Sequence, residues 1–269
     1  MAEFYEGTLD TLKERLCSSI SSFDQEWIKR CVPATEEQIR QLQDILAEHH
    51  HTIPAAYLYF LRRMGQNDGG LLENEWDGCE ADIGTVLKFR DGREDLEEGF
   101  LLFSYHWADA GFYLNLSSMD DNPVVTDICR DYMAGSFEKY LFRKAFHMYQ
   151  ERFVHSDSDS DSVCRDEKKE TEDCNMCPFY GNTAEERMDF IVRMADTYGL
   201  KKAWFSDRTH FFCYDSNYAF EIRVDEGYEV KFCCDDDKLW AQVRYSLSSF
   251  PEFFLYISKF GSCGDRNDR

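Results

Sequence analysis

The stretch TIPAAYLYFLRRMGQNDGG, residues 52–70, joins an aromatic-rich apolar pattern to a run of turn-forming residues. Its apolar side chains recur at the spacing of an amphipathic helix, and they are Tyr57, Leu58, Phe60, Leu61 and Met64. The helix can begin at Pro54, because the N–H that proline lacks would have no partner in a first turn. The Asn-Asp-Gly-Gly run is predicted to end it, since these residues tolerate positive φ and offer competing hydrogen bonds.

Another helix is predicted just before this one. The sequence TEEQ at residues 35–38 fits a capping box, in which Thr35 accepts a first-turn N–H and Gln38 reaches back. Apolar residues follow at helical spacing, and they are Ile39, Leu42, Ile45 and Leu46.

After residue 70 the apolar period becomes that of strands. Segments rich in β-branched and aromatic residues predict strands at 82–90, 99–105, 111–116 and 123–128. Ser136 then suits the N-cap of a closing helix over residues 137–153. Two helices, a mainly antiparallel or mixed sheet and a closing helix predict an α+β domain over residues 1–154.

Residues 155–173, HSDSDSDSVCRDEKKETED, contain one apolar residue besides a cysteine. Such a segment buries too little surface to offset its ordering entropy, which predicts an acidic linker. Acids outnumber bases 28 to 15 before the linker, 8 to 3 within it and 16 to 12 after it. The acidity is therefore concentrated in the first domain and the linker.

A second, smaller α+β domain is predicted over residues 174–269. A capping box at Thr183 opens a helix, and strand-like runs follow at 201–206, 210–214, 218–224 and 229–233. The ending SSFPEFFLYISKF is similar to GSFEKYLFRKAF, which closes the first domain. A degenerate repeat and a chance match both stay open as explanations.

The formal net charge of −22 argues against nucleic acid and anionic membranes as partners, because both are polyanions. A basic partner is the complement, and an acidic surface that only aids solubility is the alternative. No apolar run approaches the roughly 18 residues of a membrane span, and the N-terminus lacks the pattern of a secretory leader. We therefore expect a cytoplasmic protein whose cysteines are mostly free thiols.

Patterns for catalysis or metal binding are weak. Cys174 and Cys177 can reach one zinc ion, but no second pair completes four ligands. The histidines at 49–51 point 100° apart on a helix, and the aspartates at 235–237 suit a helix N-terminus better than Mg²⁺. No nucleophile, phosphate-loop or dinucleotide motif is present. We expect no enzyme activity, no cofactor and no metal site.

Residues 71–98 hold ten acids against three bases. An aromatic anchor ringed by carboxylates suits capture of a basic protein, because charge speeds encounter and the ring supplies contact area. A solvated loop around a core tryptophan is the alternative. The candidate partner-binding residues are Glu73, Glu75, Trp76, Asp77, Glu80, Asp82, Glu94, Asp95, Glu97 and Glu98.

The order of these motifs resembles the SUKH superfamily, which includes a yeast cell-wall assembly regulator and the bacterial Syd protein. The matching positions are Trp27, Thr35 to Glu37, Ile53-Pro54 with Tyr57, Phe60-Leu61, Asn67 with Gly69-Gly70, and SFEKYLF at 136–142. Ile53 replaces the usual leucine, and Asp68 is inserted before the glycines. The resemblance covers about half of the chain, up to residue 153.

This resemblance implies a non-enzymatic scaffold, most often an immunity protein that binds and blocks the cognate toxin of a polymorphic toxin system. The toxin is frequently a nuclease. A nuclease presents cationic side chains to the phosphates of its substrate, so an acidic inhibitor can bind the same cationic surface. The alternative is a regulatory protein–protein interaction module in which the acidic linker is a flexible or phosphorylated arm. A metal-dependent enzyme is the third reading.

Overall fold

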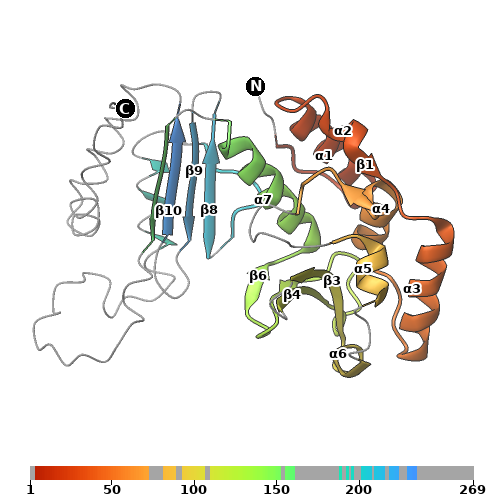
Figure 1. Ribbon diagram of the computed structural model, residues 1–269. Helices are drawn as coiled ribbons and strands as arrows, with labels where there is room; N and C mark the ends of the chain where they lie inside the picture. The colour runs from red at the N-terminus through yellow and green to blue at the C-terminus, as the bar shows by residue number, and fades with distance from the viewer. Residues whose placement is uncertain are drawn as a thin grey trace, which may run out of the picture. The chain divides into compact units, whose positions relative to one another are not determined.

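The chain divides into two units, Met1–Tyr149 and Gln150–Arg269. The computed structural model describes residues 4–72, 81–88, 93–106, 110–152, 155–160, 188–189, 192–193, 195–196, 201–207, 209–215, 218–223 and 229–234. Within these residues it contains helices and antiparallel sheets (Figure 1), which confirms the α+β class.

Helices α3 (Glu36–Glu48) and α4 (Ala55–Met64) form where the sequence predicts them. The Thr35 hydroxyl accepts the N–H of Gln38 at 3.2 Å, and the Gln38 side-chain oxygen accepts the N–H of Thr35 at 2.9 Å. The predicted capping box is therefore present. The side chains that α4 buries are Ala56, Tyr57, Phe60, Leu61 and Met64.

Three N-terminal elements were not predicted: the short helix η1 (Leu9–Thr11), α1 (Leu12–Ser21) and α2 (Trp27–Arg30). Helix α1 lies against α4 and buries Leu12, Leu16 and Ile20 at helical spacing. Trp27 is fully buried, and its indole N–H donates to the Asp68 carbonyl oxygen at 2.9 Å. The N-terminal helices thus belong to the core of the first unit.

The sheet of the first unit joins β3 (Phe100–His106), β4 (Ala110–Asn115), β5 (Val125–Thr126) and β6 (Tyr132–Ala134) in that order, all antiparallel. Strands β3, β4 and β5 overlap the predicted segments, and β6 was not predicted. Leu101 and Leu114 are paired and buried. Their neighbours on the opposite face include the pairs Phe100–Asn115 and Leu102–Tyr113.

The predicted strand at residues 82–90 is wrong, because residues 83–88 form helix α5 (Ile83–Lys88). Asp82 Oδ1 accepts the N–H of Thr85 at 3.0 Å, as an N-terminal cap does. Ile83 and Val86, three positions apart, are both buried. Capping and one buried helix face thus outweigh the strand preference of this β-branched segment. Helix α6 (Arg93–Glu97) follows, and it was not predicted either.

The closing helix is α7 (Phe137–Gln150), three residues shorter than predicted. Ser136 is its N-cap, since its hydroxyl accepts the N–H of Lys139 at 3.2 Å. The Phe137 ring lies 5.1 Å from the Phe103 ring of β3 and 5.5 Å from the Tyr57 ring of α4, between ring centroids. Helix α7 therefore packs on both the sheet and α4.

The sheet of the second unit has the order β7-β10-β9-β8 and is antiparallel. Strands β8 (His210–Tyr214), β9 (Tyr218–Arg223) and β10 (Glu229–Cys234) confirm three predicted strands. The predicted strand at residues 201–206 is wrong, because these residues form a single β-bridge, between Lys202 and Cys213. Among the helices in the described part of the chain, none is both long and apolar enough to cross a membrane.

Strand β7 (His155–Ser160) occupies the first six residues of the predicted linker. All six pair with β10, from His155 opposite Cys234 to Ser160 opposite Glu229. Ladder hydrogen bonds use backbone N–H and C=O groups, which Ser and Asp supply as well as any other residue, so a polar segment can form an edge strand. Residues 161–173 of the predicted linker lie outside the described residues.

Candidate partner-binding surface

The structure describes only part of the predicted partner-binding set. Glu73, Glu75, Trp76, Asp77 and Glu80 lie outside the described residues. Glu94 belongs to α6, but its side chain lies outside the described part. Asp82, Asp95, Glu97 and Glu98 are described, and they do not all serve one purpose.

Asp82 caps helix α5. It is half-buried, and its carboxylate is engaged as the cap of α5. The next residue, Ile83, donates its N–H to the Gly65 carbonyl oxygen at 2.7 Å, which ties the start of α5 to the end of α4. One oxygen of the Asp82 carboxylate is therefore engaged in capping α5.

Asp95 and Glu98 converge on one cation, Arg130, from the loop between β5 and β6. Arg130 Nη2 forms an ion pair with Asp95 Oδ1 and lies 3.6 Å from Glu98 Oε2. The pair with Asp95 joins residues 35 positions apart in the chain. Glu98 is two-thirds exposed, while the Arg130 side chain is 26% exposed. One cation is thus shared between two carboxylates at the end of α6.

The Arg130 guanidinium also lies on two aromatic rings of the outer sheet face. Its carbon atom Cζ is 4.1 Å from the Phe100 ring centroid and 4.4 Å from that of Tyr113, both within cation–π range. Burial, with the Asp95 carboxylate second, raises the pKa of Tyr113. Arg130 itself has a φ of +67°, an uncommon backbone conformation outside glycine.

Two loops of the sheet add acids around exposed apolar side chains. In the β4–β5 loop, Met119 is 89% exposed and is followed by exposed Asp120 and Asp121. In the β5–β6 loop, Ile128 is 45% exposed and lies one residue after Asp127. An apolar side chain held outward beside carboxylates is suited to contact a basic, partly apolar partner. The sequence signals that were missed are SSMDDN and DICRD.

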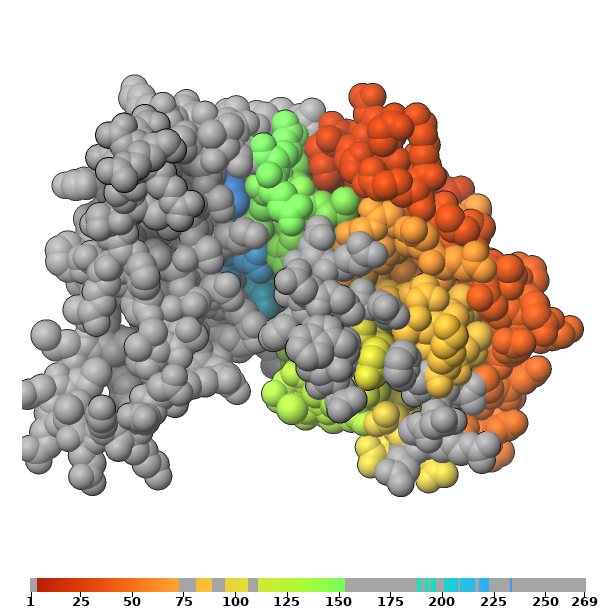
Figure 2. Space-filling model, in the orientation of Figure 1, coloured from red at the N-terminus to blue at the C-terminus, as the bar shows by residue number. Residues whose placement is uncertain are grey.

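The first of these loops lies beside the end of α6. Leu116 donates its N–H to the Gly99 carbonyl oxygen at 2.7 Å, and a Cβ added to Gly99 would meet the Ser117 hydroxyl at 2.9 Å. Exposed Glu97 and Glu98 directly precede Gly99. Figure 1 shows α6 at the end of β3, and Figure 2 shows yellow atoms of this region at the surface of the first unit. We call residues 93–98, 117–122 and 127–131 the acidic end of the sheet.

The entry to the segment at residues 73–80 is anchored by Asp68. Its carboxylate accepts the N–H groups of Gly70, Leu71 and Leu72 at 2.9 to 3.1 Å. Gly69, with a φ of +71°, lies so close to Trp27 that an added Cβ would meet the indole nitrogen at 2.7 Å. The inserted aspartate therefore builds the turn, and buried Leu71 and Leu72 fix the chain just before the acidic segment.

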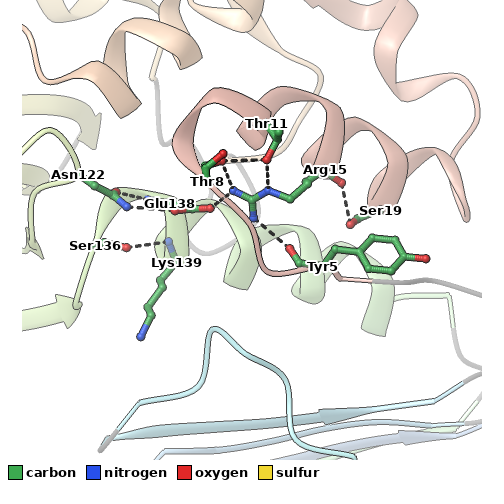
Figure 3. Close-up of polar contacts among 9 residues, drawn as sticks. All are labelled: Tyr5, Thr8, Thr11, Arg15, Ser19, Asn122, Ser136, Glu138 and Lys139. Atoms are coloured by element: carbon green, nitrogen blue, oxygen red, sulfur yellow. Dashed lines mark hydrogen bonds and ion pairs between the residues drawn. The ribbon is translucent and has the colours of Figure 1, made fainter.

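A buried polar network holds the N-terminus to α7 (Figure 3). Arg15 of α1 forms an ion pair with Glu138 of α7 and donates to the carbonyl oxygens of Tyr5 and Thr8 at 3.0 and 2.9 Å. Asn122 donates to Glu138 Oε2 at 3.1 Å and accepts the Glu138 N–H at 2.9 Å. The network fixes the loop that carries Asp120 and Asp121, so its role is architectural.

The described residues hold no group of three or more His, Cys, Asp and Glu side chains that could bind a metal ion. The predicted aspartate run at 235–237 and the pair Cys174 and Cys177 lie outside those residues. Comparisons with protein-family models, curated proteins and solved structures find no match. A function for this chain therefore has to be argued from the charges and side chains of the acidic end of the sheet.

Proposed function

We propose that this chain is a non-enzymatic immunity protein, which binds a basic, nuclease-like toxin and neutralises it by covering the cationic surface of the toxin. The observation that carries the proposal is the charge of the acidic end of the sheet. Residues 93–98, 117–122 and 127–131 together contain eight acids and two bases. The resemblance of the first half of the chain to SUKH proteins supports the same conclusion.

Electrostatics gives this surface a kinetic role. A cluster of carboxylates attracts a cationic protein over about one Debye length, roughly 8 Å at physiological salt, and this speeds encounter. Exposed charges at an interface rim mainly change the association rate. Affinity for the toxin is therefore expected to fall as salt rises, chiefly through slower association.

Contact area has to come from apolar groups, because exposed ion pairs contribute only about 0 to 1 kcal/mol each. Met119 and Ile128 are the exposed apolar side chains of the two loops. The backbone of the Met119 loop is fixed at Asp121, whose carbonyl oxygen accepts the N–H of Ala56 in α4 at 2.8 Å. A fixed loop loses little entropy on binding, which favours affinity.

The test uses the purified chain and the toxin domain encoded next to it. Association and dissociation rates are measured at low and high salt, together with the residual toxin activity at equal molar ratio. The charge-reversal variant Glu97→Lys/Asp131→Lys is expected to slow association on the order of tenfold at low salt. The wild-type chain is expected to abolish the activity of the toxin at equal molar ratio. In the presence of the variant, toxin activity is expected to return.

The matched control is Asp44→Lys/Glu48→Lys, which makes the same change in net charge on exposed positions of α3. If both variants slow association equally, only total charge matters and the acidic end of the sheet is not the binding surface. If the wild-type chain binds no adjacent toxin and protects no cell that expresses one, the immunity function is wrong.

A further inference from the structure

Arg130 fills a site that has the composition of a guanidinium receptor. Two aromatic rings, of Phe100 and Tyr113, lie 4.1 and 4.4 Å from its Cζ, and the carboxylates of Asp95 and Glu98 face its Nη2. Flat rings and paired carboxylates suit a planar guanidinium better than a compact ammonium ion. We call Asp95, Glu98, Phe100 and Tyr113 the guanidinium cage.

Arg130 combines an uncommon backbone conformation with a side chain whose hydrogen bonds are incomplete. Its backbone has a φ of +67°, in the left-handed region that a residue with a Cβ rarely adopts. Its Nη1 atom is buried and makes no hydrogen bond. A buried N–H group without an acceptor is destabilising. The side chain is also 26% exposed, so the cage opens to solvent beside the acids of the sheet end.

We propose that the guanidinium cage is a binding site for an arginine side chain of a basic partner, and that Arg130 occupies it in the free protein. This inference rests on the proposed function, and it names the group on the partner that the surface recognises. Displaced Arg130 would leave the rings and carboxylates to the partner's arginine, while the hydrogen bonds between Asp127, Arg130 and Asp131 keep the backbone of the loop in place. The partner's arginine can enter only an empty cage, so the apparent affinity equals the intrinsic affinity multiplied by the fraction of time that Arg130 leaves the cage free.

The test titrates Nα-acetyl-arginine amide into the full-length chain and follows the NMR signals of labelled Phe and Tyr rings. The variant Arg130→Gly empties the cage and suits the positive φ, so it is expected to bind the probe at least about tenfold more tightly than the wild type. Nα-acetyl-lysine amide is expected to bind more weakly than the arginine probe. Thermal unfolding checks that the variant is folded, and Arg130→Asn gives the same comparison if it is not.

Two further variants locate the site. In the Arg130→Gly background, Asp95→Asn/Glu98→Gln is expected to abolish probe binding, whereas Asp44→Asn/Glu48→Gln, which removes two exposed carboxylates of α3 outside the acidic end of the sheet, is expected to retain most of it. The inference is overturned if the folded Arg130→Gly variant binds the probe no better than the wild type. Equal binding of the arginine and lysine probes would also overturn it.

The outcomes separate this inference from the proposed function. If the emptied cage does not bind the arginine probe while a basic toxin still binds in a salt-dependent way, the inference that the cage binds arginine is wrong and the proposed function stands. If the cage binds the probe while no basic toxin is bound or neutralised, the immunity function is wrong.

Discussion

Arg15 and Glu138, 123 positions apart in the chain, form an ion pair in which each side chain is only 8% exposed. Glu138→Ala would leave the Arg15 charge buried without its carboxylate. Loss of one partner of a buried pair costs about 3–5 kcal/mol, so we expect the free energy of unfolding to fall by this amount. Urea unfolding of the variant measures it.

The control for this prediction is Glu37→Ala, which removes one partner of the exposed pair Arg40–Glu37 on α3. An exposed pair contributes about 1 kcal/mol at most, so its loss is expected to be small. Equal losses in the two variants would show that the Arg15 network does not hold the N-terminal helices to α7.

Replacement of Gly69 by any residue with a side chain is expected to destabilise the protein. Gly69→Ala would place a Cβ 2.7 Å from the Trp27 indole nitrogen at a φ of +71°. Strain of this kind costs about 1–3 kcal/mol, and the clash with a buried ring adds to it. Gly135 is exposed and has no positive φ, so Gly135→Ala is the matched control. Chemical denaturation compares the two, and equal midpoints would contradict the role given to the Gly69 turn.

The Thr35 cap is expected to stabilise α3 locally. Thr35→Ala removes the acceptor for the Gln38 N–H, and loss of such a cap costs about 1 kcal/mol. Thr52 is exposed and caps no helix among the described residues, so Thr52→Ala is the control. Denaturation midpoints and helix content by circular dichroism measure the difference. If Thr35→Ala has no more effect than the control, the stability of α3 comes from its buried face alone.

Helices α3 and α4 were predictable because local signals agree with their burial. A capping box opens α3, and a proline, an apolar face and a glycine-rich turn define α4. Helix α5 could not be predicted in this way. Its β-branched residues favour a strand, whereas its cap and the buried side chains of Ile83 and Val86 require a helix. Strand β7 depends on pairing with β10 about 75 residues later, which no local pattern reports.

Part of the candidate site could likewise be predicted from the sequence, and part could not. Composition identified the acids at 94–98, since charge is a property of the sequence itself. Composition did not show that Asp82 caps a helix, because that depends on the position of one N–H group. Nor did it show that Asp95 meets Arg130, since the sheet brings these residues together over 35 positions.

Cys31 is expected to react slowly with alkylating reagents. Burial, followed by the nearby Cys17 and Asp68, raises the pKa of Cys31 to about 12. The thiolate is the reactive form, so a raised pKa lowers its population at pH 8. We expect iodoacetamide to modify Cys31 at least about tenfold more slowly than exposed Cys129. Mass spectrometry of the peptides gives both rates, and similar rates in the folded protein would contradict the prediction.

The same shift makes stability depend on pH. Folded Cys31 holds its proton up to about pH 12, whereas the unfolded residue loses it near the ordinary value of 9.0. Since the folded state then binds more protons, the stabilisation is complete below pH 9 and is lost progressively above it. Replacement of Cys31 by Ala removes this titration, so its free energy of unfolding is expected to decline less between pH 9 and 11 than that of the wild type. A parallel decline in both proteins would mean that Cys31 does not titrate differently in the two states.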